Sequence, residues 1–309
     1  MRALVTGGGG FIGSNLVRGL LDRGDEVRVL DNFSTGDREN LAGLDVDVAE
    51  GELRSYERVH AATRGVEVVF HLGALGSVPR SVQDPLTSSA VNVEGTLNVL
   101  LAARDEGVRR VVFSSSTSVY GSSRELPTHE SAPPDPISPY GVAKLAAERY
   151  CVSFSRVYHS FETVVLRYFN VFGPRQSPHS QYAAVVPLFV TAIDRGEPVT
   201  IYGDGEQSRD FTYVANVVDA TVRAADAEGA SGRIFNVASG APASVNHLAD
   251  TIGAILGKPV ERRHEPPRPG DIRDSWADIG AARDTLGYEP SVDLATGLEL
   301  TVEAIVARV

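Results

Sequence analysis

The chain has 309 residues, of which 42% are apolar, and its formal net charge is −11. This length suits one large domain, or a nucleotide-binding domain with a smaller lobe. The negative charge argues against non-specific binding to nucleic acid or to an anionic membrane surface. The one cysteine, Cys151, permits no internal disulfide, and no Cys/His cluster indicates a metal site.

The first residues lead directly into a predicted strand. They contain no basic segment followed by an apolar run, so we expect no signal peptide. The longest apolar stretches are far shorter than the ~20 residues that span a bilayer. We therefore expect a cytoplasmic protein with no membrane partner.

The first half of the chain alternates short apolar strands with amphipathic helices. Short strands that are buried on both faces and separated by helices are typical of a parallel, doubly wound sheet. We therefore expect a Rossmann-like α/β fold. The expected strands are Ala3–Thr6, Val27–Asp31, Val46–Ala49, Val68–His71, Val111–Ser114 and Thr163–Arg167. The expected helices are Ile12–Arg23, Tyr56–Arg64, Leu86–Glu106 and Pro139–Tyr158.

The pattern changes after Asn170. The stretch Gly173–Tyr182 is rich in Pro, Ser and Gln, as expected of an exposed loop. We expect a nucleotide-binding domain over residues 1–170 and a smaller C-terminal substrate lobe over 171–309, with segments around 211–238 returning to the first domain. The expected elements of the second half are short ones at Val185–Asp194 and Val199–Tyr202, a helix over Phe211–Ala225 and a strand over Ile234–Ala238.

A glycine-rich turn follows the first strand, with Gly7, Gly10 and Gly13 spaced GxxGxxG. One glycine permits the tight turn, a second lets the backbone approach a pyrophosphate, and a third lets the helix pack close to the strand. The helix N-terminus then offers N–H groups and partial positive charge to the anion. A glycine-rich loop without a ligand is the alternative interpretation.

Asp31 ends the second strand, 18 residues after Gly13. A carboxylate there can accept hydrogen bonds from both hydroxyls of an adenosine ribose and would repel the 2′-phosphate of NADP. No arginine flanks Asp31 to favour that phosphate. The pattern therefore predicts NAD as the cofactor, although a strand-end turn residue is the alternative for Asp31. Glu52, after the third strand, either faces the adenine amino group or is a solvated loop charge.

Tyr140 and Lys144 form a YxxxK pair on one face of a predicted helix. A phenol with a pKa of ~10 is a poor base at neutral pH. A nearby ammonium, together with the positive nicotinamide of NAD, lowers that pKa. The phenolate could then take a proton from a sugar hydroxyl while hydride leaves the same carbon. An exposed tyrosine and lysine at a helix start are the alternative interpretation.

A run of hydroxyl residues, Ser114 to Ser118, ends the fifth strand. In an open α/β sheet, ligands bind beyond the carboxyl ends of the strands, so these hydroxyls could relay a proton or hold a substrate oxygen. A serine-rich turn is the alternative. The glycine turn on one side and the YxxxK pair on the other favour the functional interpretation.

With these motifs in order, the chain resembles the extended short-chain dehydrogenase/reductase family along essentially its whole length. Eight stretches are similar to those of UDP-glucose and UDP-N-acetylglucosamine 4-epimerases: TGGGGFIGSNL, LDNFSTG, LGSVPRS, FSSSTSVYG, SPYGVAK, LRYFNVFGPRQ, GDGEQSRDF and RPGDIRDSWAD. The resemblance implies that Tyr140 is the catalytic base, Lys144 its electrostatic partner and a ribose ligand, and Ser116 the hydroxyl between Tyr140 and the substrate. The chain departs from the family pattern at Glu52, where an Asp is usual, and at Gly73, where HLAA is frequent.

The resemblance also implies two sets of contacts. The cofactor-binding set is Gly7, Gly10, Phe11, Ile12, Gly13, Asp31, Asn32, Glu52, Leu53, Leu72, Ala74, Tyr140 and Lys144. The substrate-binding set is Gly76, Ser116, Thr117, Tyr140, Asn170, Gln176, Ala184, Val186, Tyr202, Arg209, Arg268, Asp271 and Ser275. By this likeness Arg209 and Arg268 bind the diphosphate, since guanidinium groups suit phosphate oxygens. Asp271 would accept from the uridine ribose, and Asn170 would donate to the diphosphate or the sugar.

Other reactions of this fold are disfavoured by single positions. The 4,6-dehydratases carry an Asp-Glu pair where this chain has Thr117 and Ser118, and UDP-glucuronate decarboxylases usually have Glu at the second position. Net reductases tend to use NADPH, which Asp31 disfavours. The sequence thus favours an NAD-dependent UDP-hexose 4-epimerase, with UDP-glucuronate 4-epimerase or another NAD-dependent sugar-nucleotide-modifying enzyme as the alternative. A non-catalytic dinucleotide-binding regulator is disfavoured because the YxxxK pair is intact.

The sugar and the oligomeric state are predicted from the same likeness. Strict UDP-glucose enzymes tend to have tyrosine at the position of Ser275, and Gly76 and Ala184 are also small, so we expect UDP-N-acetylglucosamine to be accepted, with Gln176 or Asn170 binding the acetamido group. Glucuronate epimerases usually have an arginine where this chain has Ser177, and a buried carboxylate without a cation is costly. UDP-glucuronate is therefore the less favoured substrate.

We expect a homodimer, because the helices at 86–106 and 139–158 carry surplus apolar positions and their family equivalents pair across a two-fold axis.

Overall fold

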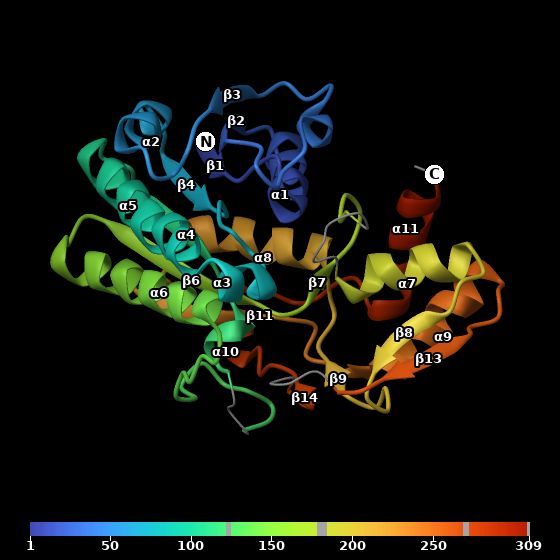
Figure 1. Cartoon of the computed structure of the whole chain (residues 1–309). Coiled ribbons are helices and arrows are strands. Elements are labelled where there is room, and N and C mark those ends of the chain that lie inside the picture. The colour runs from blue at the N-terminus through green and yellow to red at the C-terminus, as the bar shows by residue number, and fades with distance from the viewer. Residues whose placement is uncertain (122–124, 178–183, 268–271, 308–309) are drawn as a thin grey trace.

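A parallel sheet of seven strands forms the centre of the computed structural model (Figure 1). The structure describes residues 1–121, 125–177, 184–267 and 272–307. The strand order is β11-β6-β5-β4-β1-β2-β3. The first strand therefore lies inside the sheet, β2 and β3 extend it to one edge, and the later strands extend it to the other. This order confirms the predicted doubly wound α/β fold. The strands are β1 (Arg2–Thr6), β2 (Glu26–Asp31), β3 (Asp47–Glu50), β4 (Val68–His71), β5 (Arg110–Ser116), β6 (Glu162–Tyr168) and β11 (Arg233–Val237).

Helices cover both faces of the sheet, and each face has its own apolar core. Successive side chains of a strand point to opposite faces, so Val5 joins one core and Leu4 joins the other. This double burial is why the strands are continuous apolar runs in the sequence. The first layer contains α1 (Phe11–Asp22), α8 (Val214–Asp226) and α10 (Gly280–Leu286), and the second contains α2 (Tyr56–Thr63), α5 (Gly95–Asp105) and α6 (Pro139–Val157).

The predicted helix Leu86–Glu106 is less regular than expected. The short helices α3 (Val78–Gln83) and α4 (Pro85–Ser89) lead into a π-helical turn, Ala90–Glu94, before α5 begins. In this turn the amide of Asn92 accepts from the N–H of Leu75 at 2.8 Å and donates to its carbonyl at 3.1 Å. The irregular turn therefore fixes the loop that follows β4.

The smaller lobe has a third apolar core, to which Phe189, Ile201, Leu248 and Leu298 belong. In Figure 1 this lobe lies to the right of the sheet. Short strands connect it to the rest of the chain. Its elements are α7 (Val185–Asp194), β8 (Val199–Tyr202) paired with β13 (Arg262–Glu265), α9 (Val245–Leu256) and α11 (Leu294–Val306), and the short strands are β7 (Val171–Phe172), β9 (Ser208–Arg209), β10 (Thr212–Tyr213), β12 (Ala243–Ser244) and β14 (Asp274–Ser275).

The predicted helix Phe211–Ala225 is wrong at its start. Thr212 and Tyr213 form β10, which pairs with β7, and α8 begins only at Val214. Tertiary packing decides this, because Phe211 and Tyr213 are anchored in the lobe core. The chain then returns to the sheet, where β11 pairs with β6.

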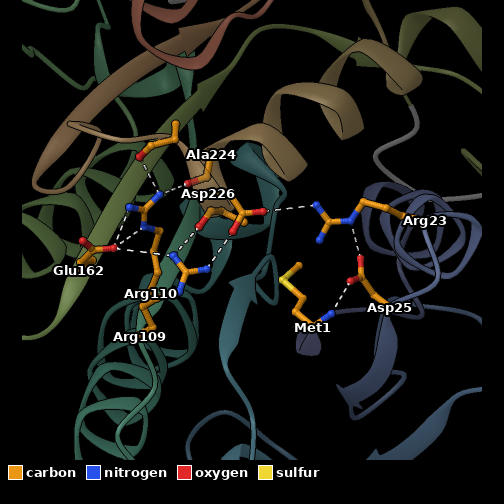
Figure 2. A network of polar contacts seen from close by, with 10 residues as sticks. Met1, Arg23, Asp25, Arg109, Arg110, Glu162, Ala224 and Asp226 are labelled. Atoms are coloured by element: carbon orange, nitrogen blue, oxygen red, sulfur yellow. Dashed lines mark hydrogen bonds and ion pairs between the residues drawn. The ribbon is translucent and has the colours of Figure 1, made fainter.

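A network of charged side chains ties α8 to the amino ends of β5 and β6 (Figure 2). Arg110 is buried, and its guanidinium donates to Glu162 at 2.7 Å and to the carbonyl of Ala224 at 2.9 Å. Arg109 donates to Asp226 at 2.9 Å. These contacts occupy one end of the strands and leave the carboxyl ends for a ligand site. In the described part of the chain, no helix has the length and apolar character needed to cross a membrane.

Candidate functional site

A groove lies over the carboxyl ends of β1, β2, β3 and β4, the position at which open α/β sheets bind ligands. Phe11, Ile12 and Gly13 begin α1 directly after Gly10. The structure brings together most of the residues that the sequence assigned to the cofactor. Those that line the groove are Gly7, Gly10, Asp31, Asn32, Glu52, Leu53, Leu72 and Ala74.

Two glycines of the turn are required by the atoms packed around them. Gly7 has a φ of +73°, and a Cβ atom on it would lie 2.7 Å from Cα of Gly73. A Cβ atom on Gly13 would lie 2.1 Å from the carbonyl oxygen of Gly7. A larger residue at either position would push α1 away from β1 and block the close approach of a diphosphate. The turn therefore fits a dinucleotide.

Asp31 is held rigidly at the edge of the groove. One carboxylate oxygen accepts from the N–H of Gly9 and the other from the N–H of Phe33, both at 2.8 Å. Arg38 lies nearby in sequence, but its guanidinium stacks 4.1 Å from the Phe33 ring centroid and pairs with Glu50 at 2.6 Å. The carboxylate of Asp31 thus lines the groove, while the guanidinium of Arg38 is paired with Glu50 instead.

The position of Glu52 is compatible with either interpretation that the sequence allowed, and its role stays a prediction. It lines the groove, as an adenine contact requires, and it also forms an ion pair with Arg54, which lines the groove too. Arg54 and Arg80, the latter from α3, both line the groove and were not predicted from the sequence.

The proposed catalytic hydroxyls lie together at the end of β5 and the start of α6. Ser138 caps the start of α6, because its side chain accepts from the N–H of Gly141 at 3.1 Å, and Ser116 lies beside the phenol of Tyr140. Ser116 also donates to the hydroxyl of Ser118 at 3.1 Å. Lys144 donates through Nζ to the carbonyl of Ser114 at 2.7 Å. The YxxxK pair and the serine run therefore lie close together.

Burial controls the protonation of this pair. It raises the pKa of Tyr140 to about 12, and the neighbouring hydroxyl of Ser116 opposes the shift. Burial lowers the pKa of Lys144 to about 8, and nearby Cys151 and Glu148 oppose that shift. Lys144 is not among the groups that shift the pKa of this phenol, and its ammonium donates to the carbonyl of Ser114. The lowered pKa that the sequence analysis expects in the presence of the nicotinamide charge stays a prediction.

Ser81, which was not predicted from the sequence, contacts the main chain of Tyr140. Its hydroxyl accepts from the N–H of Tyr140 at 3.1 Å and donates to the carbonyl of Val78 at 2.7 Å. This residue lies in LGSVPRS, a stretch that the family resemblance marked without giving it a role.

A second cavity of about 470 Å³ is formed mainly by residues of the lobe, and Asn170, which follows β6, also lines it. Three predicted substrate residues line it: Asn170, Tyr202 and Arg209. Most of its other wall residues are apolar and were not predicted from the sequence, although the spacing of apolar residues in α7 indicates them. Those walls include Val185, Leu188, Phe189, Ala192, Ile201 and Phe211.

The predicted contact Val186 is found in the lobe core instead of the cavity wall. Helical geometry explains the difference. Residues three or four apart share a face, so Val185 shares the cavity face with Leu188 and Phe189. Val186 and Val190 are also four residues apart, and both are buried in the lobe core.

The remaining predicted substrate residues are dispersed. Gln176 donates to the carbonyl of Val171 at 3.2 Å, and its buried Oε1 has no hydrogen-bond partner among the described residues. Ser275 lies in β14, paired with Arg209. Gly76 and Ala184 are exposed, and Thr117 begins a 3-10 turn after Ser116. Arg268 and Asp271 lie outside the described residues.

Comparison with known proteins agrees with this geometry. Residues 3–238 match the NAD dependent epimerase/dehydratase family. The chain belongs to this family. It is 43% identical over 310 residues to a UDP-glucose 4-epimerase of Mycolicibacterium smegmatis, with 98% of each sequence covered. The match confirms the resemblance seen in the sequence, the expectation of an enzyme and the expectation of NAD as cofactor.

Solved structures of relatives have the same fold over the whole chain. A UDP-glucose 4-epimerase from Thermotoga maritima, crystallised with UDP-glucose, is 40% identical and superposes with a TM-score of 0.95, covering 100% of this chain and 99% of that one. A UDP-N-acetylglucosamine 4-epimerase from Methanobrevibacter ruminantium, in complex with UDP-N-acetylmuramic acid, is 38% identical with the same TM-score of 0.95 and the same coverage of 100% and 99%.

Proposed function

We propose that this chain is an NAD-dependent UDP-hexose 4-epimerase that inverts carbon 4 of UDP-glucose and UDP-galactose through a 4-keto intermediate. One observation carries the proposal. Ser116 and Tyr140 meet at the end of β5, and β5 lies between β4, whose loop lines the groove, and β6, which leads to Asn170 in the second cavity. The reacting hydroxyls thus lie between a cofactor groove and a substrate cavity.

The residues of the site have distinct roles in this proposal. NAD, when bound, accepts the hydride of carbon 4 and returns it to the opposite face. Tyr140 holds the proton of the 4-hydroxyl, and Ser116 lies between this phenol and the sugar. Lys144 supplies positive charge next to the site, which favours the phenolate when the nicotinamide charge is also present. Each proton transfer needs a group held within hydrogen-bond reach of the sugar oxygen.

Elimination and decarboxylation are less well supported. The positions that follow Ser116 hold Thr117 and Ser118, which are not acids or bases in the required pKa range. Ser118 instead accepts a hydrogen bond from Ser116. The site is therefore equipped for reversible hydride and proton transfer at one carbon.

The second cavity suits the UDP group. Arg209 and Asn170 provide donors for a diphosphate, and guanidinium groups bind phosphate oxygens well. The apolar walls contributed by α7 and β8, with Tyr202, suit a flat uracil ring.

We assign residues 1–170 to NAD binding and residues 171–309 to binding of the UDP-sugar, with the segment 211–238 returning to the first domain. Ser275, a small residue beside Arg209, leads us to propose that UDP-N-acetylglucosamine is also accepted, and the 38% identical relative acts on that sugar.

A homodimer is part of this proposal. Neighbouring helices α3, α4 and α6 carry apolar side chains that face solvent in the single chain: Val82 is 64% exposed, Leu86 83%, Val142 53% and Tyr150 40%. Pairing of this face with its copy across a two-fold axis would bury it. A cytoplasmic location stays a prediction of the sequence.

The proposal is tested by incubating the purified protein separately with UDP-glucose, UDP-N-acetylglucosamine and UDP-glucuronate and separating the products. We expect UDP-galactose from UDP-glucose, without net reduction of NAD. Conversion of UDP-glucuronate alone would favour the alternative epimerase. Binding of NAD without conversion of any of the three sugars would contradict the proposal.

A further inference from the structure

A buried carboxylate, Asp210, lies directly after Arg209 where the lobe joins the sheet. Its side chain is fully shielded from solvent. Four groups donate to the carboxylate: the N–H groups of Ser239, Gly240 and Ala277 at 2.8, 3.0 and 3.3 Å, and the hydroxyl of Ser239 at 2.6 Å. These donors come from the segment after β11 and the segment after β14. One carboxylate therefore joins the edge of the sheet to the lobe.

The main chain of Asp210 contacts the proposed substrate residues directly. Its N–H donates to the carbonyl of Ser275 at 2.9 Å, and its carbonyl accepts from the amide of Asn170 at 3.4 Å. Arg209, the preceding residue, pairs with Ser275 in the β9–β14 ladder. The guanidinium of Arg209 also donates to the carbonyl of Arg273, before β14, at 3.0 Å. The positions of Asn170, Arg209 and Ser275 thus depend on one short stretch of backbone.

The carboxylate itself does not face the substrate cavity. Arg209 lines that cavity and Asp210 does not, as expected of successive residues in an extended segment. A carboxylate that faced a diphosphate would repel it, so its orientation away from the cavity suits a supporting role. Burying a carboxylate is costly unless donors surround it, and burial does raise the pKa of Asp210 while its hydrogen bonds oppose the shift.

We propose that Asp210 is a positioning residue for the UDP-sugar. Its carboxylate fixes the segment that carries Ser275 against the end of β11, and this fixes Arg209 and Asn170 relative to each other around the diphosphate and the sugar. The inference rests on the function proposed above. It predicts that loss of the carboxylate weakens binding of UDP far more than binding of NAD, whose groove lies over β1 to β4.

The test uses Asp210→Asn in the full chain, with UDP as the probe. The amide keeps the shape of the carboxylate but turns an NH₂ group toward two of the four donors, and unsatisfied buried donors cost about 1–3 kcal/mol. We expect the Kd of UDP to rise about tenfold or more, and the Kd of NAD to change less than about twofold. The KM for UDP-galactose should rise more than kcat falls.

Tyr288→Phe is the matched control. The Tyr288 hydroxyl is buried and donates to the carbonyl of Ala238 at 2.7 Å. Ala238 directly precedes Ser239, which donates to Asp210. Its loss removes a buried hydrogen bond from the same region without changing the donors to Asp210. We expect a lower thermal midpoint in this variant with the Kd of UDP unchanged.

The single tryptophan of the chain, Trp276, gives a second readout, because it lies between Ser275 and Ala277. We expect Asp210→Asn to increase quenching of its fluorescence by acrylamide, and saturating UDP to reverse part of the increase. An unchanged Kd of UDP in Asp210→Asn, or an equal loss of UDP and NAD binding, would overturn the inference. A wild-type protein that binds UDP but converts no UDP-hexose would overturn the proposed function alone.

Discussion

Arg167 binds Glu148 through two hydrogen bonds inside the protein, from Nε to Oε1 at 2.9 Å and from Nη2 to Oε2 at 2.7 Å. The two side chains are 1% and 0% exposed. Ser115 donates to the same carboxylate at 2.5 Å. Glu148 lies one helical turn after Lys144, so this pair joins the helix that carries Tyr140 to both β5 and β6. The ion pair therefore holds the catalytic helix on the sheet.

We expect Arg167→Met to lower the free energy of unfolding by about 3–5 kcal/mol, because it leaves the carboxylate of Glu148 buried without its cation. Urea denaturation measures this change. Arg223→Met is the control, because it removes an ion pair with Asp219 in which both side chains are more than 40% exposed, and such pairs contribute little. Similar stability losses in the two variants would contradict the importance of the buried pair.

Tyr140→Phe should reduce epimerisation by about 10²-fold or more while NAD still binds, because general base catalysis typically contributes at least that much. The phenol is the group that the site holds against Ser116. Tyr158→Phe, which alters a tyrosine at the end of the same helix, should retain activity. Near-normal turnover of UDP-galactose by Tyr140→Phe would remove this residue from the role of base.

The sequence predicts the sheet and the cofactor turn well because their signals are local. β1 and β4 are apolar runs beside helices, and the turn at Gly7 needs a conformation that glycine favours. The lobe is harder to predict, because β9 and β14 have two residues each and form only through pairing between distant positions, such as 208 with 244 and 208 with 274. Phe211 to Tyr213 continue a helical pattern in the sequence, but tertiary contacts place them in the lobe core.

Some elements that were not predicted do have recognisable patterns in the sequence. α9 begins after Ser244, whose side chain accepts from the N–H of His247, and ends at Gly257 with a φ of +63°. Both are ordinary helix-boundary signals. Glu148 continues the four-residue spacing of Tyr140 and Lys144. The role of Asp210 carried no local signal, because its donors lie about 30 and 67 residues away in the sequence.

Asp31 should make the protein prefer NAD over NADP by about tenfold or more. Its carboxylate is fixed by Gly9 and Phe33, so it cannot easily turn away from a 2′-phosphate, and juxtaposed like charges are unfavourable. Calorimetric titration of nucleotide-free protein with each dinucleotide measures the preference, and Asp31→Asn should narrow it. Equal affinities of the wild type for NAD and NADP would show that Asp31 does not select the cofactor.

Light scattering at micromolar concentration should show a dimer. Leu86→Glu places a charge at the most exposed apolar side chain of the α3, α4 and α6 face, and we expect it to yield monomers. Leu300→Glu, at a 41% exposed position on α11, should leave the dimer intact. A wild-type monomer would count against the proposed interface.

The size of residue 275 should decide whether an N-acetylated sugar is accepted. Ser275 is held in place by its main chain, since its carbonyl accepts from Asp210 and its strand pairs with Arg209. A change of side chain should therefore alter the space beside Arg209 without displacing the backbone. An acetamido group needs more room than the 2-hydroxyl of glucose, and a tyrosine ring would fill that room.

We expect the wild type to convert UDP-N-acetylglucosamine and Ser275→Tyr to lose this activity while it retains conversion of UDP-glucose. Ser275→Ala is the control for the hydroxyl, and it should convert both sugars because it keeps the space. Separating the products of each variant with each sugar gives the ratio of the two activities directly. If Ser275→Tyr still converts UDP-N-acetylglucosamine, the size of residue 275 does not exclude the acetamido group. If the wild type converts UDP-glucose alone, the small side chain of Ser275 is not sufficient for acceptance of the N-acetylated sugar. Either result would contradict the prediction.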